Sequence, residues 1–197
     1  MKLVRLSTVA SLLAVVVLQA RAMTVVKRDF PELVARAEQI VIGTVTDVSH
    51  EVDAVGSPST LVTFSDLVVL KGSADGTVTL RMYGGPTGNV VIQVPDMPQF
   101  ATGERDVLFI AGNGRDVCPL VGVWQGRFRV QFNTALGMDV IADSIGTPIL
   151  GLAGRQLVRA ARDAAAGHAA APQNPISLDE FRRLIADELA HPQPAAE

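Results

Sequence analysis

The chain contains seven short segments of β type separated by turn residues, and this pattern constrains the fold more than any other feature. β-branched residues are common in these segments, and several segments alternate apolar and polar positions. No stretch between them is long and periodic enough to be the helical crossover that a parallel sheet requires. The pattern predicts a mainly β fold, a small antiparallel barrel or sandwich, with strands near 39–50, 60–72, 76–85, 89–94, 105–112, 119–132 and 138–143.

Three of these segments predict which side chains face the core. In 76–85, Val78, Leu80 and Met82 alternate with polar residues, so one face of that strand is expected to be buried. The continuous apolar run in 105–112 predicts a strand buried on both faces. In 119–132, alternation predicts two faces, one with Trp124, Gly126, Phe128, Val130 and Phe132, the other with Gln125, Arg127, Arg129 and Gln131.

A helix is predicted on each side of the β region. Asp29 is expected to cap a short helix that ends near Glu38. A capping-box pattern at Ser177 and Glu180 begins a second helix, 177–191. An isolated helix of this length is marginal in water, so its apolar stripe must be covered by the chain's own barrel or by a partner protein. The stripe consists of Leu178, Phe181, Leu184, Ile185 and Leu189.

The first 22 residues have the layout of a secretory signal peptide. Lys2 and Arg5 precede an uncharged apolar run, and Ala20-Arg21-Ala22 supplies the small-x-small cleavage pattern. The alternative, an N-terminal membrane anchor, needs a longer apolar run. We therefore expect export to the periplasm or beyond the cell and no membrane span after cleavage. The predicted organisation is a signal peptide (1–22), a β-barrel domain with its helix (23–155), an Ala-rich linker (156–176) and the C-terminal helix (177–191).

The charge of the predicted mature chain argues against nucleic acid and anionic membrane surfaces as partners. Three of the 17 basic residues lie in 1–22, so the remainder keeps 14 basic against 20 acidic residues, a net charge of −6. Nucleic acids and anionic lipid surfaces both favour clustered cations.

The glycine-rich segment RMYGGPTGN (81–89) is a candidate nucleotide-binding loop. A phosphate loop needs a lysine and a hydroxyl residue after its second glycine, and a dinucleotide loop needs three spaced glycines before a helix. Neither pattern is present, so we interpret the segment as a strand-ending turn or bulge and GNGRD (112–116) as a hairpin turn. No cofactor is predicted.

Catalytic and metal motifs are not found. The histidines His50, His168 and His191 are far apart in sequence, and no second histidine accompanies His50 at zinc-protease spacing. No G-x-S-x-G serine motif is present. A hydrolase site assembled from dispersed residues, His50 or a carboxylate pair among them, stays open as an alternative.

Two surface features remain as candidates for binding. Arginines on predicted outward faces could form a patch for an anionic or polar ligand, although an ordinary solvated face is the alternative. The candidate ligand surface is Arg81, Tyr83, Gln125, Arg127 and Arg129. Cys118, the single cysteine, is expected to be a buried thiol, with an intermolecular disulfide as the alternative. Trp124 is expected in the core.

The order of segments across residues 30–150 resembles a group of uncharacterised exported bacterial proteins. The resemblance rests on EQIVIGTVTDV, TVTLRMYGG, FATGERDVLFI and GVWQGRF, and most specifically on Leu70-Lys71-Gly72 and Gly103-Glu104. It implies an oligonucleotide/oligosaccharide-binding (OB) type barrel, similar to the netrin and tissue-metalloprotease-inhibitor module. The inhibitors place an N-terminal cysteine on the protease zinc, and this chain departs from that pattern because its only cysteine is Cys118.

Together these observations predict an exported, non-catalytic binding module. Its expected partner is a protein or glycan of the cell envelope or the surroundings. The first alternative is a regulator or inhibitor of a secreted protease, with VPDMPQF (94–100) or YGGPTGN (83–89) as a protruding loop. The second alternative is the dispersed hydrolase.

Overall fold

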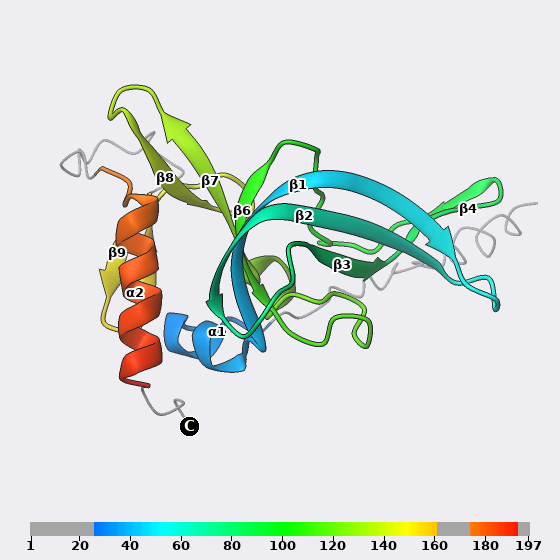
Figure 1. Ribbon diagram of the computed structural model, residues 1–197, viewed down its shortest axis with the longest axis horizontal. Helices are drawn as coiled ribbons and strands as arrows, with labels where there is room; N and C mark the ends of the chain where they lie inside the picture. The colour runs from blue at the N-terminus through cyan, green and yellow to red at the C-terminus, as the bar shows by residue number, and fades with distance from the viewer. Residues whose placement is uncertain (1–25, 161–173, 193–197) are drawn as a thin grey trace, which may run out of the picture.

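The computed structural model describes residues 26–160 and 174–192, and the fold is mainly β (Figure 1). The predicted signal peptide, His168 and most of the predicted linker lie outside these residues. Six strands form one antiparallel sheet in the order β3-β2-β1-β6-β7-β8. They are β1 (Gln39–Val52), β2 (Pro58–Lys71), β3 (Val78–Tyr83), β6 (Arg105–Ile110), β7 (Arg127–Asn133) and β8 (Met138–Asp143).

Two short hairpins accompany this sheet. The first is β4 (Gly85–Thr87) with β5 (Val90–Ile92), and the second is β9 (Ile149–Ala153) with β10 (Gln156–Arg159). Because β10 occupies 156–159, the linker prediction was wrong at its start. The sequence pattern missed β9 and β10 because glycines and charged residues interrupt their apolar positions.

The antiparallel prediction is confirmed, but within the described residues the sheet is open between β3 and β8 and does not close into a barrel. β1 is the shared strand, pairing with β2 along its length and with β6 over its first part. Its pairing with β2 shifts register three times, which bends both strands. Gly43 lies at one shift, where a Cβ would sit 2.7 Å from Leu67 Cδ2 and 3.1 Å from Phe64 Cβ.

The sheet carries a separate hydrophobic core on each face. In β6, Val107 and Phe109 belong to the core beneath the helices, whereas Leu108 and Ile110 belong to the core on the opposite face. This confirms the predicted two-sided burial of β6. The alternation predicted for β3 is also confirmed, with Val78, Leu80 and Met82 buried and their neighbours exposed.

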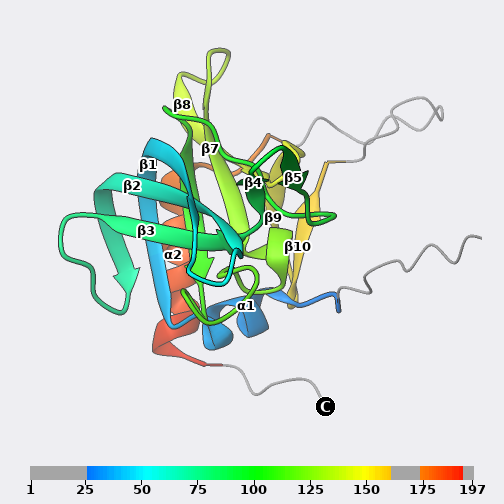
Figure 2. The same cartoon turned by 90° about the vertical axis from the view of Figure 1, so that its right-hand side faces the viewer.

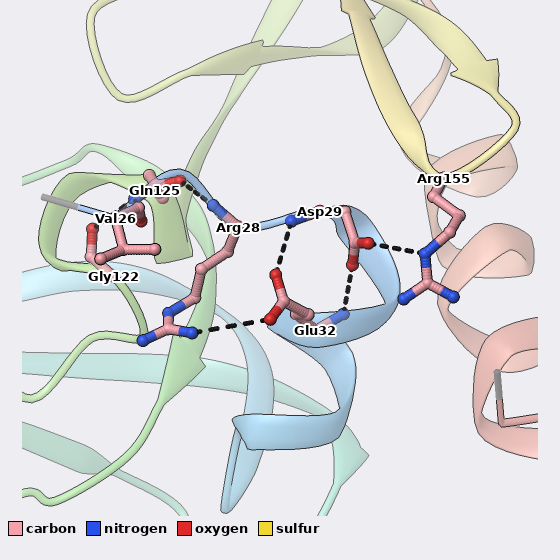
Figure 3. A network of polar contacts seen from close by, with 7 residues as sticks. All are labelled: Val26, Arg28, Asp29, Glu32, Gly122, Gln125 and Arg155. Atoms are coloured by element: carbon pink, nitrogen blue, oxygen red, sulfur yellow. Dashed lines mark hydrogen bonds and ion pairs between the residues drawn. The ribbon is translucent and has the colours of Figure 1, made fainter. Parts of the chain in front are cut away.

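Helix α1 (Phe30–Arg36) is fixed at both ends by side chains. Asp29 Oδ1 accepts the Glu32 amide at 2.9 Å and Glu32 returns a bond to the Asp29 amide, which is a complete capping box (Figure 3). At the other end, Lys71 Nζ donates to the carbonyls of Val34 at 2.8 Å and Ala35 at 3.2 Å. The Leu70-Lys71-Gly72 motif thus ends β2 and caps α1.

Helix α2 (Leu178–Ala190) lies against the chain's own sheet, in contact with β8 and β2, and near α1 (Figures 1 and 2). Phe181 and Ile185 are fully buried, and the Phe181 ring centroid is 4.9 Å from that of Phe128 and 5.8 Å from that of Phe30. Leu184 and Leu189 pack partly buried against the same core. The alternative that a partner protein covers the apolar stripe of α2 is therefore corrected, because the stripe packs against the chain's own core.

The start of the described chain is tied to a 3₁₀ helix, η1 (Val123–Gly126). Gln125 Oε1 accepts the Arg28 amide at 2.8 Å, and Gln125 Nε2 donates to the Val26 carbonyl at 2.9 Å (Figure 3). The predicted strand 119–132 is thus broken by η1, and β7 begins only at Arg127; its two predicted faces are not observed, because Arg127 and Phe128 are both buried and Phe132 is exposed. Buried Gln125 is a structural residue rather than part of an exposed patch.

Candidate functional site

The segment RMYGGPTGN forms the end of β3 and the first strand of the β4–β5 hairpin. Gly84 and Gly85 have φ angles of 110° and 136°, which side-chain-bearing residues rarely adopt. A Cβ on Gly84 would sit 2.9 Å from the Ile92 carbonyl oxygen, and one on Gly85 would sit 3.1 Å from His50 Nδ1. The predicted turn is present, and it carries a hairpin that passes close to β1 and β2.

This hairpin forms the roof of a pocket of about 460 Å³, which we call the hairpin pocket. Its floor is the sheet, where Val62 and Met82 are almost fully buried. Pro86 and Ile92 line it from the hairpin, and Met97 and Phe100 line it from the segment before β6. Sequence reasoning missed this site because its lining runs from Val48 to Phe100, 52 positions apart, and these residues meet only when β1, β2 and β3 pair.

The hairpin pocket is uncharged along its lining. Among the described residues that line it there is no Asp, Glu, Lys or Arg, and the polar side chains are His50, Thr60, Tyr83, Gln93 and Gln99. Gln93 and Gln99 are exposed, which places them at the rim. An apolar interior with a few polar side chains is the usual composition of a ligand pocket.

His50 and Thr60 form a short polar chain in this pocket, and the hydrogen bond from Thr60 to the Gly84 carbonyl does not activate the Thr60 hydroxyl as a nucleophile. Thr60 Oγ1 donates to the Gly84 carbonyl at 2.8 Å, so its proton is already committed. His50 Nδ1 lies 3.1 Å from Thr60 Oγ1, and with the Thr60 proton on the Gly84 carbonyl it is the donor of this contact. A general base would have to accept the hydroxyl proton instead.

A second pocket, of about 610 Å³, adjoins the hairpin pocket at residues 97–99. Both pockets are lined by Met97, Pro98 and Gln99, and Trp124 and Arg127 line the second one. We call it the arginine pocket. Trp124 is half-buried in η1, where it lines the arginine pocket. It was predicted to lie in the core but belongs to neither core cluster.

Arg127 is only 3% exposed, which corrects its placement on an outward face. Its Nη2 contacts Glu104 at 2.7 Å and Asp106 at 3.0 Å, and its Nη1 donates to the Gln99 carbonyl at 2.6 Å. The guanidinium carbon also lies 4.0 Å from the centroid of the Phe100 ring. The segment before β6 covers this face of β7, and alternation within β7 cannot reveal that cover.

The two carboxyls that contact Arg127 have pKa values shifted in opposite directions, downward for Glu104 and upward for Asp106. Burial alone would raise the pKa of Glu104, but hydrogen bonds from the Ala101 amide and Arg127, with the charges of Arg127 and Arg129, hold that pKa below its usual value. Burial raises the pKa of fully buried Asp106, and Arg127 only partly opposes it. Arg127 Nε and Asp106 Oδ1 are buried and have no hydrogen-bond partner among the described residues.

The structure does not bring the five predicted ligand residues together. Arg81 lies on β3 and pairs with Glu51 at 3.0 Å, whereas Arg129 lies on β7 and pairs with Glu104 at 2.5 Å. Strands β2, β1 and β6 separate them. Tyr83 is the one member that lines the hairpin pocket.

Cys118 is half-buried and packs against the second core. Burial raises the pKa of its thiol to about 11; a bond from the Leu120 amide opposes the rise and the Asp116 charge adds to it. Within the described residues, no group of three or more His, Cys, Asp and Glu side chains is arranged to hold a metal ion.

Comparison with protein-family models, with curated proteins and with solved structures finds no match to this chain. In 26–160 and 174–192, no helix has the length and apolar character needed to cross a membrane.

Proposed function

We propose that this protein is an exported, non-catalytic binding module of the cell envelope or the extracellular space, and that the hairpin pocket is its binding site. The observation that carries the proposal is the pocket itself: a cavity of ligand size, formed by β1, β2, β3, the β4–β5 hairpin and the segment before β6, and lined by apolar side chains with a polar rim. The signal-peptide pattern of residues 1–22 supports export.

We also propose that the sheet is an opened form of the OB-type barrel. In its support, β1 is long and bent and lies between β2 and β6. The connection from β6 to η1 also reaches across to β3, where the Tyr83 amide donates to the Val117 carbonyl at 2.9 Å. A partly open Greek-key barrel is typical of this fold.

Regulation of a secreted protease is the second candidate function, and the β4–β5 hairpin favours it. Val90 and Val91 on this hairpin are 62% and 60% exposed, and exposed apolar side chains on a hairpin suit insertion into a protease cleft. Val91 also lines the hairpin pocket, so Val90, which does not line it, and Ile92, which does, are the residues that distinguish the two candidates.

The test is capture from the native envelope fraction by the immobilised chain from residue 23, with bound protein, glycan and lipid each identified by mass spectrometry. Ile92→Asp places a charge in the hairpin pocket, and Val90→Asp places the same charge on the exposed strand nearby. Capture lost only with Ile92→Asp supports the pocket. Capture lost only with Val90→Asp, with a protease among the bound proteins, supports the regulator and overturns the pocket proposal. Equal capture by the native chain, Ile92→Asp and Val90→Asp overturns both the pocket proposal and the regulator.

A further inference from the structure

We infer that the hairpin pocket takes an uncharged aliphatic chain, such as the hydrocarbon part of a fatty acid or of a lipid. This inference rests on the proposed binding function and names its ligand class.

Charge is the first argument. The described lining holds no acidic or basic side chain apart from His50, although the cluster of Glu104, Asp106, Arg127 and Arg129 lies just beyond the shared wall. An ionised group placed in the pocket would lose hydration, and no Asp, Glu, Lys or Arg side chain lines the pocket to compensate its charge. The interior therefore selects a neutral apolar group, and any charged end of the ligand must stay in water at the rim.

Lining chemistry is the second argument. Val62, Met82, Ile92 and Met97 are aliphatic or thioether side chains in the lining, and Val62 and Met82 are almost fully buried. Of the polar lining side chains, Gln93 and Gln99 are exposed, and Thr60 already donates to the Gly84 carbonyl, which leaves few hydrogen-bonding groups for the many hydroxyls of a glycan. Methionine side chains adapt to chains of different shape. The exposed rim glutamines, Gln93 and Gln99, suit a polar head group that remains hydrated.

The third argument is that the edge of β3, next to the pocket, is not free to pair with an extended peptide. The free edge of β3 is occupied by Asn113, whose Oδ1 accepts the Arg81 amide at 3.0 Å and whose Nδ2 donates to the Thr79 carbonyl at 2.8 Å. A partner strand would have to displace these bonds before it could pair with β3.

The experiment measures binding of the neutral apolar dye N-phenyl-1-naphthylamine to the mature chain. Trp124, the only tryptophan, lines the adjoining arginine pocket and serves as the energy-transfer donor. We expect saturable binding at one site, weakened by about tenfold or more in Ile92→Asp and changed by less than about twofold in Val90→Asp. Near-ultraviolet circular dichroism of both variants checks that the fold is retained.

Displacement of the dye then separates the possible sources of the chain. Dodecanol, laurate and monomeric dihexanoyl phosphatidylcholine supply a neutral chain, a chain with a free carboxylate and the acyl chains of a lipid. Displacement by dodecanol and laurate identifies a free aliphatic chain, and displacement by the phospholipid alone identifies a lipid. Glucose is the control and is expected to displace none.

Failure of this inference is distinguishable from failure of the proposed function. If no aliphatic compound displaces the dye, or if the dye does not bind, the aliphatic assignment is wrong. If an envelope protein or glycan is still captured in an Ile92-dependent way, the proposed function stands with a different ligand. Equal dye binding by the Ile92→Asp and Val90→Asp proteins would also overturn the assignment, because the dye would then lie elsewhere.

Discussion

Arg127 holds the segment that divides the two pockets. Its guanidinium contacts Glu104, Asp106, the Gln99 carbonyl and the Phe100 ring, so one buried cation joins the start of β7 to the residues before β6. Removing one member of a buried ion pair leaves its partner charge in the interior without compensation. The shared wall of the pockets therefore depends on this side chain.

Arg127→Met is expected to lower the free energy of unfolding by about 3 kcal/mol, because Asp106 would remain buried without its cation. Urea denaturation measures the change. Arg129→Met is the matched control, since Arg129 pairs with the same Glu104 but is 32% exposed, and we expect a loss below about 1 kcal/mol. Equal losses in the two variants would contradict the assigned role of Arg127.

Cys118 is expected to react slowly with thiol reagents. With its pKa raised to about 11, the thiolate fraction at pH 8 is small. We expect alkylation by iodoacetamide about a hundredfold slower in the native protein than in urea, where the pKa returns to about 8.5. Similar rates in both conditions would show an accessible thiol and would reopen the intermolecular disulfide.

At the scale of elements, one aromatic cluster joins the two helices to the sheet, and one buried carboxylate joins α1 to the β9–β10 hairpin. Phe181 of α2 meets Phe30 of α1 and two phenylalanines of the sheet. Asp29 caps α1 and also accepts Arg155 Nε at 2.6 Å, which ties α1 to the turn between β9 and β10 (Figure 3).

Phe181→Ala is expected to cost about 3–5 kcal/mol of unfolding free energy, because it empties a fully buried position shared by both helices and the sheet. Chemical denaturation tests this. Arg183→Ala, on the exposed face of α2, is expected to cost no more than about 0.5 kcal/mol. A small effect of Phe181→Ala would mean that α2 is not held by this cluster.

Asp29 is expected to make stability depend on acid pH. Burial alone would raise its pKa, but the Arg155 bond and charge and the Glu32 amide hold the pKa below its usual value. Its contribution is therefore present above about pH 4, the unfolded pKa, and is lost as pH falls through the lower folded pKa.

Denaturation from pH 6 to pH 2 tests this by comparing the native chain with Asp29→Asn, which keeps a capping oxygen but not the charge. The difference in stability between the two should shrink as pH falls. A constant difference would show that the Asp29 charge does not contribute.

At the scale of the whole molecule, an open sheet must protect its edges from pairing with other chains. Asn113 covers β3 with its side-chain amide, and the residues before α2 cover β8, where Ile141 donates its amide to the Ile176 carbonyl at 3.1 Å. Both covers come from distant parts of the chain.

Asn113→Ala is expected to increase self-association, because it uncovers the Arg81 amide and the Thr79 carbonyl at the β3 edge. Sedimentation velocity at several concentrations measures the larger species. Asn133→Ala is the control, since Asn133 Oδ1 accepts amides of its own turn and covers no edge. The edge interpretation fails if Asn113→Ala sediments like the native protein.

The amino-acid sequence by itself determined the features that depend on neighbouring residues. Alternation in β3, two-sided burial of β6, the Asp29 cap and the apolar stripe of α2 follow from period and local hydrogen bonding, and each was predictable. The glycine turn at Gly84 and Gly85 was also readable, because positive φ angles strongly favour glycine.

Only the tertiary structure decided where those elements meet. Alternation along the strand predicts that Arg127 and Phe128 face opposite ways, but it cannot show that Gln99 and Phe100 cover Arg127. An amphipathic helix has the same pattern whether its own sheet or a partner covers it, and the buried Phe181 settles this for α2. The hairpin pocket depends on the pairing of β1, β2 and β3 and on the approach of β4–β5, since its walls are far apart in the chain and have no shared period.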